Sequence, residues 1–349
     1  MSHVLVVRLD NAGDVLLTGP AVRAVAAGAQ RVTLLCGPAG SAAGRLLPGV
    51  DHIEVYRAGW IDPDPPLLDS YAALTLAGSL GARGIDRALV FTSFHQSALP
   101  TALLLRLAGI SEIAAYSDDY AGSLLDVRHR IDPDVHEVER ALSLAASFGY
   151  TLPDGDDDRM RVDVGGAGAA LRPAEPYVVV HPGASVPARA WAPERYTRLV
   201  DALARSGRAV VVTGTPDEAT LTARVSGPSR PGVTDLGGRT DLAELGGLMA
   251  GADAVVVGNT GPAHLAAAVG TPVASLYAPT VPAVRWRPWR VPHALLHRDV
   301  ACAGCRAREC PVPAHPCIDG VDVAEVLDAV DALGGRGLAV SGQGGKGVR

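Results

Sequence analysis

The sequence predicts an α/β protein of two doubly wound halves, each a parallel sheet covered by helices on both faces. Three observations lead to this prediction. The length of 349 residues suits two domains better than one. Short runs rich in Val and Leu alternate with helical segments along most of the chain. Residues 151–176 interrupt this alternation with an acidic cluster, a Gly/Ala run and prolines, which indicates a connection.

The elements of the first half follow from its apolar runs. Strands are expected at residues 3–7, 32–36, 53–56, 88–92 and 113–116. Helices are expected at residues 15–27, 39–47, 67–80, 97–108 and 136–148. Pro20 lies inside the first of these helices and predicts a kink there.

The second half repeats the alternation of strands and helices. Its clearest strands are expected at residues 177–180, 210–213, 254–257 and 273–277. Its clearest helices are expected at residues 193–206, 242–249, 262–269 and 321–333. We therefore expect a first domain at residues 1–165, a second at 175–333, and a mobile Gly-rich tail at 334–349.

Charge and hydropathy argue against several classes of protein. Lys and Arg number 31 against 37 Asp and Glu, a net charge of −6, so no nucleic-acid partner is expected. No apolar run approaches the ~18 residues of a transmembrane helix. The first residues lack the layout of a signal peptide. A cytoplasmic protein without a transmembrane segment is expected, and peripheral membrane contact stays open.

Residues 258–264, with the sequence GNTGPAH, are the strongest motif because they follow an expected strand and open a helix. Gly261 allows a ligand to approach the backbone, and Pro262 suits the first helical position. Thr260 is a candidate N-cap. Free N–H groups at a helix start bind anions such as phosphate, and an ordinary strand–helix turn is the alternative.

Two other segments carry polar groups at the carboxyl ends of expected strands, where open α/β sheets bind ligands. In the second half, residues 181–191 contain Ser185 and Arg189, whose side chains can bind phosphate oxygens. The alternative interpretation of this segment is a solvated loop around a buried Trp. In the first half, residues 11–14 present Asp14, which can act as a general base or only cap a helix.

Absent motifs and the cysteines limit the chemistry. No G-x-G-x-x-G follows the first strand, which disfavours a dinucleotide-dependent oxidoreductase, and no Walker A sequence occurs. The Asp-x-Asp pairs lie beside prolines, so neither a catalytic metal nor a cofactor is expected. Four of the five cysteines lie close together in the sequence. They could form a structural zinc site or a loop of reduced cysteines, and both alternatives stay open. These four are Cys302, Cys305, Cys310 and Cys317.

Together these segments resemble the bacterial heptosyltransferases of glycosyltransferase family 9, which build the lipopolysaccharide inner core. The resemblance covers about residues 4–333, and the cysteine-rich segment is also similar to one in many family members. Its carriers are Gly13-Asp14-Val15-Leu16-Leu17-Thr18, His181-Pro182-Gly183-Ala184-Ser185 with Arg189 and Trp191, and Asn259-Thr260-Gly261-Pro262-Ala263-His264-Leu265-Ala266-Ala267-Ala268.

The resemblance implies the GT-B fold, with the acceptor on the first half and a nucleotide sugar on the second. It implies an inverting, metal-independent glycosyltransferase that moves a sugar, heptose in the family, from an ADP-linked donor to a glycan, glycolipid or small-molecule hydroxyl. Asp14 matches the proposed catalytic base, and Asn11 and Gly13 belong to its acceptor-side loop. The matching donor-site residues are Ser185, Arg189, Glu218, Asn259, Thr260, Gly261 and His264.

Two departures concern the donor, since Asn259 stands where the family commonly has Asp and Arg189 stands where it usually has Lys. Two other functions stay open. A nucleotide-sugar 2-epimerase shares the expected architecture but needs more acid and base groups than the sequence offers. A non-catalytic nucleotide-sugar-binding protein would not need Asp14.

Overall fold

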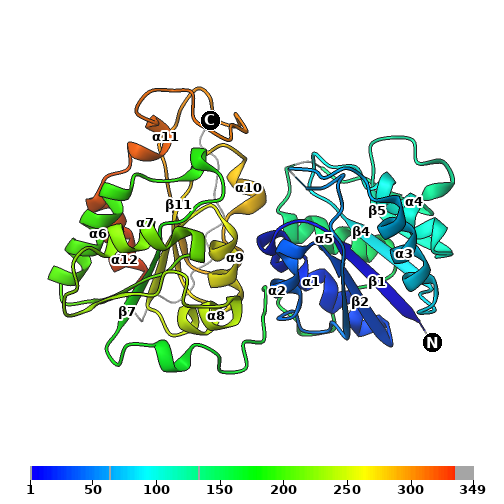
Figure 1. Cartoon of the computed structure of the whole chain (residues 1–349), viewed down its shortest axis with the longest axis horizontal. Helices are drawn as coiled ribbons and strands as arrows, with labels where there is room; N and C mark the ends of the chain where they lie inside the picture. Colours follow the sequence, from blue (N-terminus) through cyan, green and yellow to red (C-terminus); the bar gives the residue numbers. More distant parts are fainter. Residues whose placement is uncertain (1, 63, 133, 335–349) are drawn as a thin grey trace.

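A computed structural model describes residues 2–334 of the chain except 63 and 133. It confirms the predicted class, because two six-stranded parallel sheets carry helices on their faces. The two halves lie side by side, and α9 and α10 of the second half face the first half near α1 and α2 (Figure 1). No helix among the described residues is long and apolar enough to span a membrane.

The first sheet has the strand order β3-β2-β1-β4-β5-β6. Its strands are β1 (His3–Arg8), β2 (Arg31–Cys36), β3 (His52–Val55), β4 (Arg87–Phe91), β5 (Glu112–Tyr116) and β6 (Val127–His129). The helices of this half are α1 (Ala12–Gly28), α2 (Ser41–Gly44), α3 (Ser70–Gly81), α4 (Leu99–Leu107) and α5 (Glu137–Ser147), with 3₁₀ turns η1 (Pro38–Gly40) and η2 (Gly122–Leu124).

The second sheet has the order β12-β11-β10-β7-β8-β9. Its strands are β7 (Tyr177–His181), β8 (Ala209–Val212), β9 (Val233–Asp235), β10 (Ala254–Gly258), β11 (Val273–Leu276) and β12 (His293–Leu296). The helices are α6 (Pro193–Arg205), α7 (Ala219–Ser226), α8 (Leu242–Ala250), α9 (Gly261–Ala268), α10 (Ala283–Trp286), α11 (Pro316–Asp319) and α12 (Val323–Gly334), with 3₁₀ turns η3 (Ala169–Leu171), η4 (Pro187–Arg189) and η5 (Pro216–Glu218).

The two sheets share one topology. Read from its other edge, the second sheet runs β9-β8-β7-β10-β11-β12, which repeats the order of the first. In both, the chain winds outward in one direction and then restarts beside the first strand, so the strand order reverses between β1 and β4 and between β7 and β10. Ligands of open α/β sheets bind outside the carboxyl ends of the strands at such a switch point.

Several predicted bounds were wrong. Helix α1 begins at Ala12, three residues before the expected start, so Asp14 lies in its first turn and not in a loop. The helix expected at residues 39–47 is reduced to η1 and the four-residue α2. Strands β6, β9 and β12 and helix α7 were missed. The expected tail at 334–349 lies outside the described residues after Gly334.

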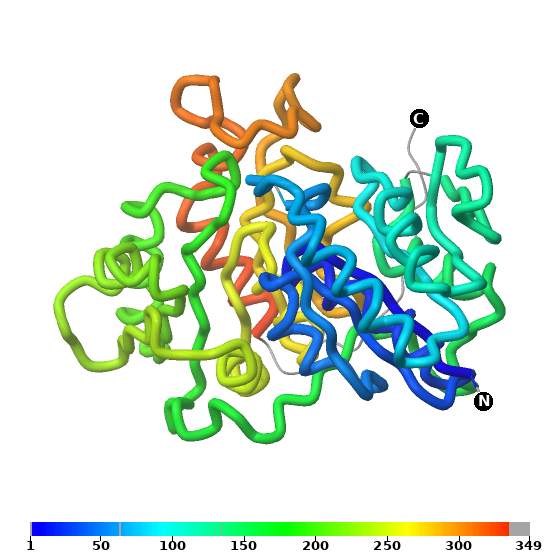
Figure 2. The backbone as a smooth tube through the Cα atoms, turned by 45° about the vertical axis from the view of Figure 1, so that its right-hand side comes forward, coloured from blue at the N-terminus to red at the C-terminus, as the bar shows by residue number. Residues whose placement is uncertain are grey.

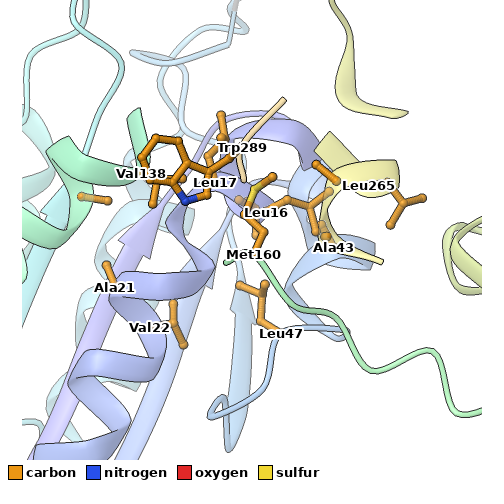
Figure 3. Close-up of a cluster of buried hydrophobic side chains, with 14 of the residues drawn as sticks. Leu16, Leu17, Ala21, Val22, Ala43, Leu47, Val138, Met160, Leu265 and Trp289 are labelled. Atoms are coloured by element: carbon orange, nitrogen blue, oxygen red, sulfur yellow. The ribbon is translucent and has the colours of Figure 1, made fainter. Parts of the chain in front are cut away.

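One hydrophobic core spans both halves. It joins residues of α1 with residues of α5, α9 and the second sheet. Figure 3 shows Leu16 and Leu17 of α1 gathered with Leu265 of α9, Met160 of the connection and Trp289 of the second half. Because these side chains come from both halves, burial of apolar surface holds the halves against each other.

The connection between the halves is tied down at several points. Residues 151–176 pass along one side of the molecule from the first half to the second (Figure 2). Asp156 forms a two-pronged ion pair with Arg23 of α1, with both N–O distances 2.9 Å. Asp158 accepts a hydrogen bond at 2.8 Å from Arg290 of the second half. The acidic cluster of this segment therefore links both halves.

Candidate active site

The candidate site lies where the switch points of the two sheets meet. Asp14 follows β1, and residues 92–96 follow β4 on the other side of the first switch point. Arg189 follows β7, and residues 259–264 follow β10 at the second switch point. The loops that the topology predicts to bind ligands therefore come from both halves, and they carry the polar residues singled out in the sequence.

The two halves lie in close contact at Gly13. A Cβ atom placed on Gly13 would lie 3.0 Å from Cδ2 of His264 and 3.1 Å from Cα of Gly261. Helix α1 thus begins against the start of α9, so Gly13, the neighbour of Asp14, lies against residues 259–264, the donor-side loop that the resemblance predicts. A side chain at residue 13 would require His264 or Gly261 to shift by a few tenths of an ångström.

Arg8 holds the carboxylate of Asp14. Its Nη2 donates to Oδ1 of Asp14 at 2.9 Å and to the hydroxyl of Ser93 at 3.0 Å. Its Nε lies 2.8 Å from Asp10, and its Nη1 lies 4.0 Å from Glu137. Arg8 is only 4% exposed. One buried guanidinium therefore organises three carboxylates from two elements and a loop.

The surroundings of Asp14 suit a general base. Burial, opposed by Arg8 and reinforced by Asp10 and Glu137, raises the pKa of Asp14 to about 6. Burial alone would lower the pKa of Arg8, but the three carboxylates raise it above its ordinary value. Asp14 is thus largely ionised at neutral pH and remains basic enough to accept a proton.

The donor-side loop holds buried polar atoms without partners. Among the described residues, Oδ1 of Asn259, Oγ1 of Thr260 and Nδ1 of His264 are buried and make no hydrogen bond. Such orphaned atoms are rare in proteins, and three in one short loop indicate a place for a ligand. Burial, followed by His136 and Arg189, lowers the pKa of His264 to about 3, so its ring is neutral.

Arg189 is a partly buried cation with neutral neighbours. Its Nε donates to the Thr280 hydroxyl at 3.3 Å, and its Nη1 donates to the Asn259 carbonyl at 3.5 Å. Burial lowers the pKa of Arg189, and Tyr277 and Asp14 oppose this shift, so Asp14 is the charged group within electrostatic reach of Arg189. A guanidinium in this position favours an anionic ligand.

The remaining predicted residues lie at the edges of this site. Ser185 is exposed between β7 and η4. Asn11 is the N-cap of α1 and, like Thr260 before α9, makes no capping bond with its side chain. Glu218 caps η5, accepting from the Thr215 N–H at 2.9 Å, and its Oε2 lies 3.8 Å from Nε2 of His181. Glu218 thus completes the capping box of η5, and the donor-binding role expected of it remains a prediction.

Several polar residues of the site were missed in the sequence. Arg8 and Asp10 offered a signal, because charges that directly follow an apolar strand lie at the carboxyl edge of a sheet. Gln96 donates to Asp10 at 2.5 Å, and Glu137 begins α5, where an acid is expected only to favour the helix start. Nothing local distinguishes Ser93, Gln96 or Glu137 from surface residues.

Aromatic and cationic side chains join the halves beside this site. The Arg285 guanidinium lies 4.3 Å from the ring centre of Phe94, and that of Arg306 lies 4.4 Å from it. Phe94 belongs to the loop after β4, whereas both arginines belong to the second half. These contacts place the loop that carries Ser93 and Gln96 against the second half.

Comparison with known proteins gives a family. The profile of "Glycosyltransferase family 9 (heptosyltransferase)" matches residues 73–315, more than half of the chain. The chain is 34% identical over 150 residues to "Lipopolysaccharide heptosyltransferase 3" of Escherichia coli, a match that covers 42% of this chain and 43% of that one. It is 32% identical over 226 residues to "Lipopolysaccharide heptosyltransferase 1" of Pseudomonas aeruginosa, covering 62% and 61%.

Solved structures confirm the predicted GT-B fold. The structure of E. coli "ADP-heptose lps heptosyltransferase II" superimposes with a TM-score of 0.75 at 20% identity, over 96% of this chain and 98% of that one. At this identity the likeness concerns the fold alone. The sequence matches span less than two thirds of the length of the curated relatives.

Proposed function

The chain belongs to glycosyltransferase family 9, and from this premise we propose that it transfers a sugar from a nucleotide-diphosphate donor to a hydroxyl group of an acceptor. One observation carries the proposal. A loop with three orphaned buried polar atoms, at Asn259, Thr260 and His264, begins a helix directly against the turn that presents Asp14. Anion binding and base catalysis are the two functions that such a transfer needs at one point.

Asp14 is the proposed base. Its carboxylate takes the proton of the acceptor hydroxyl while that oxygen attacks the anomeric carbon of the donor sugar. The nucleotide diphosphate leaves from the opposite face, so one displacement inverts the anomeric centre. Arg8 supports this role because it orients the Asp14 carboxylate through the 2.9 Å hydrogen bond.

The donor diphosphate is proposed to lie between Arg189 and the start of α9. The guanidinium supplies a positive charge, and the N–H groups of the helix start supply oriented donors without a metal ion. Both act more strongly on the departing diphosphate as its charge grows, which is the condition for accelerating the reaction. The neutral Nδ1 of His264 supports this arrangement as a further hydrogen-bonding group.

We propose ADP-linked heptose as the donor and a hydroxyl of a glycan, glycolipid or small molecule as the acceptor. Support comes from the relatives, two of which are named lipopolysaccharide heptosyltransferases, and from the solved ADP-heptose enzyme. The first half, residues 1–165, is the proposed acceptor domain, and residues 175–333 are the proposed donor domain. The donor sugar is most open to differ from heptose because of Asn259, where an amide replaces the carboxylate that is common in the family.

The test is a transfer assay with ADP-, GDP-, UDP- and dTDP-sugars, with and without candidate acceptors and with a chelator present. ADP-heptose should release ADP only with an acceptor, and nuclear magnetic resonance should show an inverted anomeric centre. Asp14→Asn should lower turnover by about 10²–10⁴-fold. The matched control is Asp299→Asn, because the side chain of Asp299 is fully solvent-exposed.

Each other outcome rejects part of the proposal. Turnover of Asp14→Asn within a few-fold of the unmodified protein would reject Asp14 as the base. A donor sugar isomerised without acceptor would favour the epimerase. Nucleotide binding without release for every donor and acceptor pair would favour a non-catalytic binding protein.

A further inference from the structure

Phe94 is an aromatic residue whose place in the molecule the proposed reaction leaves unexplained. It belongs to the loop that follows β4, and its side chain is partly buried. The three hydrophobic clusters of the described residues do not include it. Burial in an apolar core is the usual reason for a phenylalanine, so Phe94 needs a different one.

The neighbours of the Phe94 ring are cations of the second half. The guanidinium carbon of Arg285 lies 4.3 Å from the ring centre, and that of Arg306 lies 4.4 Å from it. Arg285 belongs to α10, which faces the first half (Figure 1), and Arg306 belongs to the segment that separates β12 from α11. The face of an aromatic ring attracts cations at such distances. One ring therefore contacts two separate segments of the other half.

Arg285 has few other partners for its charge. It is 6% exposed, and among the described residues its buried Nε has no hydrogen-bond partner. Its ion pair with Asp134 is long, at 3.9 Å, and the Asp134 side chain is 76% exposed, so water screens this pair. Burial of a guanidinium costs free energy unless its charge is compensated. The negative face of the Phe94 ring supplies part of that compensation.

The loop after β4 also holds the side chains around the candidate base. The hydroxyl of Ser93 accepts a hydrogen bond from Arg8 at 3.0 Å, and Gln96 donates to Asp10 at 2.5 Å. Ser93 and Gln96 are bonded to each other, because the Ser93 N–H donates to the Gln96 side chain at 2.9 Å. Arg8 in turn orients the Asp14 carboxylate. A shift of this loop would therefore move the base.

Arg306 is connected on its other side to the donor-side residues. Its N–H donates to the Thr280 carbonyl at 2.9 Å, and the Thr280 hydroxyl accepts from Nε of Arg189 at 3.3 Å. Arg189 is the residue proposed to bind the donor diphosphate. The contact of Phe94 with Arg306 thus completes a continuous series of contacts from the candidate base to the candidate diphosphate-binding residue.

We propose that Phe94 is a positioning residue for the transfer reaction. Its ring binds Arg285 and Arg306, and this contact holds the first half at a fixed place on the second. The Asp14 base is thereby aligned with the bound donor, although Phe94 itself touches neither substrate. The inference rests on the proposed function and deepens it, because a hydroxyl and a donor held on different halves react only when the halves are aligned.

The first test measures turnover. Phe94→Leu keeps an apolar side chain but removes the ring, so kcat should fall about 10–100-fold, the loss expected when a catalytic group is displaced. The Kd for ADP should hardly change, because Arg189 and the start of α9 are intact. Phe94→Tyr keeps the face of the ring and should recover most of kcat. A Phe94→Leu protein with normal kcat, or a Phe94→Tyr protein as slow as Phe94→Leu, would overturn the inference.

The matched control is Phe148→Leu. The Arg87 guanidinium lies 4.6 Å from the Phe148 ring centre, so this ring makes a contact of the same kind within the first half. Phe148 is 7% exposed and follows α5. Its replacement should lower stability and leave kcat unchanged. An equal loss of kcat in both leucine variants would reduce the effect to lost stability and overturn the positioning role.

A double-variant cycle tests whether the ring acts through Arg306. Arg306→Met removes the charge and keeps the backbone N–H that donates to Thr280. If one contact accounts for both residues, Phe94→Leu/Arg306→Met should be no slower than Phe94→Leu alone. Losses of kcat that multiply in the double variant would overturn the link to Arg306.

The last test needs no substrate. Phe94→Leu should speed hydrogen exchange several-fold at the amides of Ser93 and Gln96 in the first half and of Arg306 in the second, because it removes the contact that joins them. Phe148→Leu should leave these rates unchanged. Unchanged exchange in either half would overturn the inference and leave the proposed function standing. Exchange that responds in a protein that transfers no sugar would reject the proposed function and leave the contact of the halves in place.

Discussion

At the residue scale, the site depends on one buried arginine shared among carboxylates. Arg8 contacts Asp10 and Asp14 at 2.8 and 2.9 Å, and Glu137 lies 4.0 Å away. Burial, together with the neighbouring carboxylates of Asp10 and Glu137, raises the pKa of Asp14 and so favours a proton on it. Asp14 is the carboxylate of this group that lies against the donor-side loop, so its protonation bears on the proposed reaction.

The acidic limb of the pH profile should report Asp14. A general base acts when deprotonated, so kcat/KM should be constant above the pKa of about 6 and fall tenfold per pH unit below it. Arg8→Lys keeps the charge but loses the forked guanidinium that contacts several carboxylates. The pKa of Asp14 should therefore rise, and the acidic limb of the profile should move to higher pH. A profile that is flat between pH 5 and 8, or unmoved by Arg8→Lys, would contradict this assignment.

Arg189 should bind the nucleotide. Arg189→Ala removes charged hydrogen bonds worth about 1.5–3 kcal/mol, so the Kd for the nucleoside diphosphate should rise about 10–100-fold by calorimetry. Arg189→Lys, which restores the residue usual in the family, should recover much of the affinity. Unchanged affinity of the alanine variant would remove Arg189 from the site.

At the element scale, two helix starts of different halves meet. Helix α1 begins at Ala12 and α9 at Gly261, and each directly follows a strand at a switch point. A Cβ atom at residue 13 would lie tightly against the start of α9, so glycine suits this position. The close approach of these two helices aligns the base with the anion-binding loop.

Two alanine substitutions at helical glycines should have opposite effects. Gly13→Ala places a methyl group 3.0 Å from His264 and 3.1 Å from Gly261. It should lower kcat and cost roughly 1–3 kcal/mol of stability through overpacking. Gly78→Ala in α3 meets nothing within 4 Å and should add up to about 1 kcal/mol. Denaturant unfolding and turnover measure both, and a fully active, stable Gly13→Ala protein would rule out the tight junction.

At the scale of the whole molecule, Trp289 ties three parts together. It is 6% exposed in the core that spans both halves. Its ring stacks on His136 of the first half with centroids 4.3 Å apart, and its indole N–H donates to the Asp158 carbonyl at 3.0 Å. His136 in turn hydrogen-bonds the Arg287 carbonyl at 2.9 Å. The two halves and their connection therefore share packed contacts.

Truncating this side chain should loosen the molecule. Trp289→Ala should cost about 3–5 kcal/mol in free energy of unfolding, because it leaves a cavity between the halves. Separate unfolding transitions for the two halves are expected once this contact is lost. Tyr71→Ala, at a side chain 82% exposed, should leave stability unchanged within about 0.5 kcal/mol. A single transition at the original denaturant concentration for Trp289→Ala would show that the halves do not depend on it.

Much of the fold and part of the site follow from local sequence. Strands such as β7 and β10 are apolar runs buried along their whole length, which is why their positions were predicted within a residue or two. The missed β6 and β9 have three residues each and lie at sheet edges, where one neighbouring strand supplies the order that their sequences do not. The predicted domain boundaries remain a prediction.

The alternation of strands and helices, and the polar residues that follow the strands, can be predicted from the local sequence. Asp14 and Arg189 are candidates singled out in this way, because the end of an apolar strand is a local property, and their roles remain predictions. Only the tertiary structure decided that α1 and α9 begin against each other and that Glu137 approaches Arg8. Those contacts join residues more than a hundred positions apart, and the packing of two sheets and a shared core sets them, whatever the propensity of any short segment.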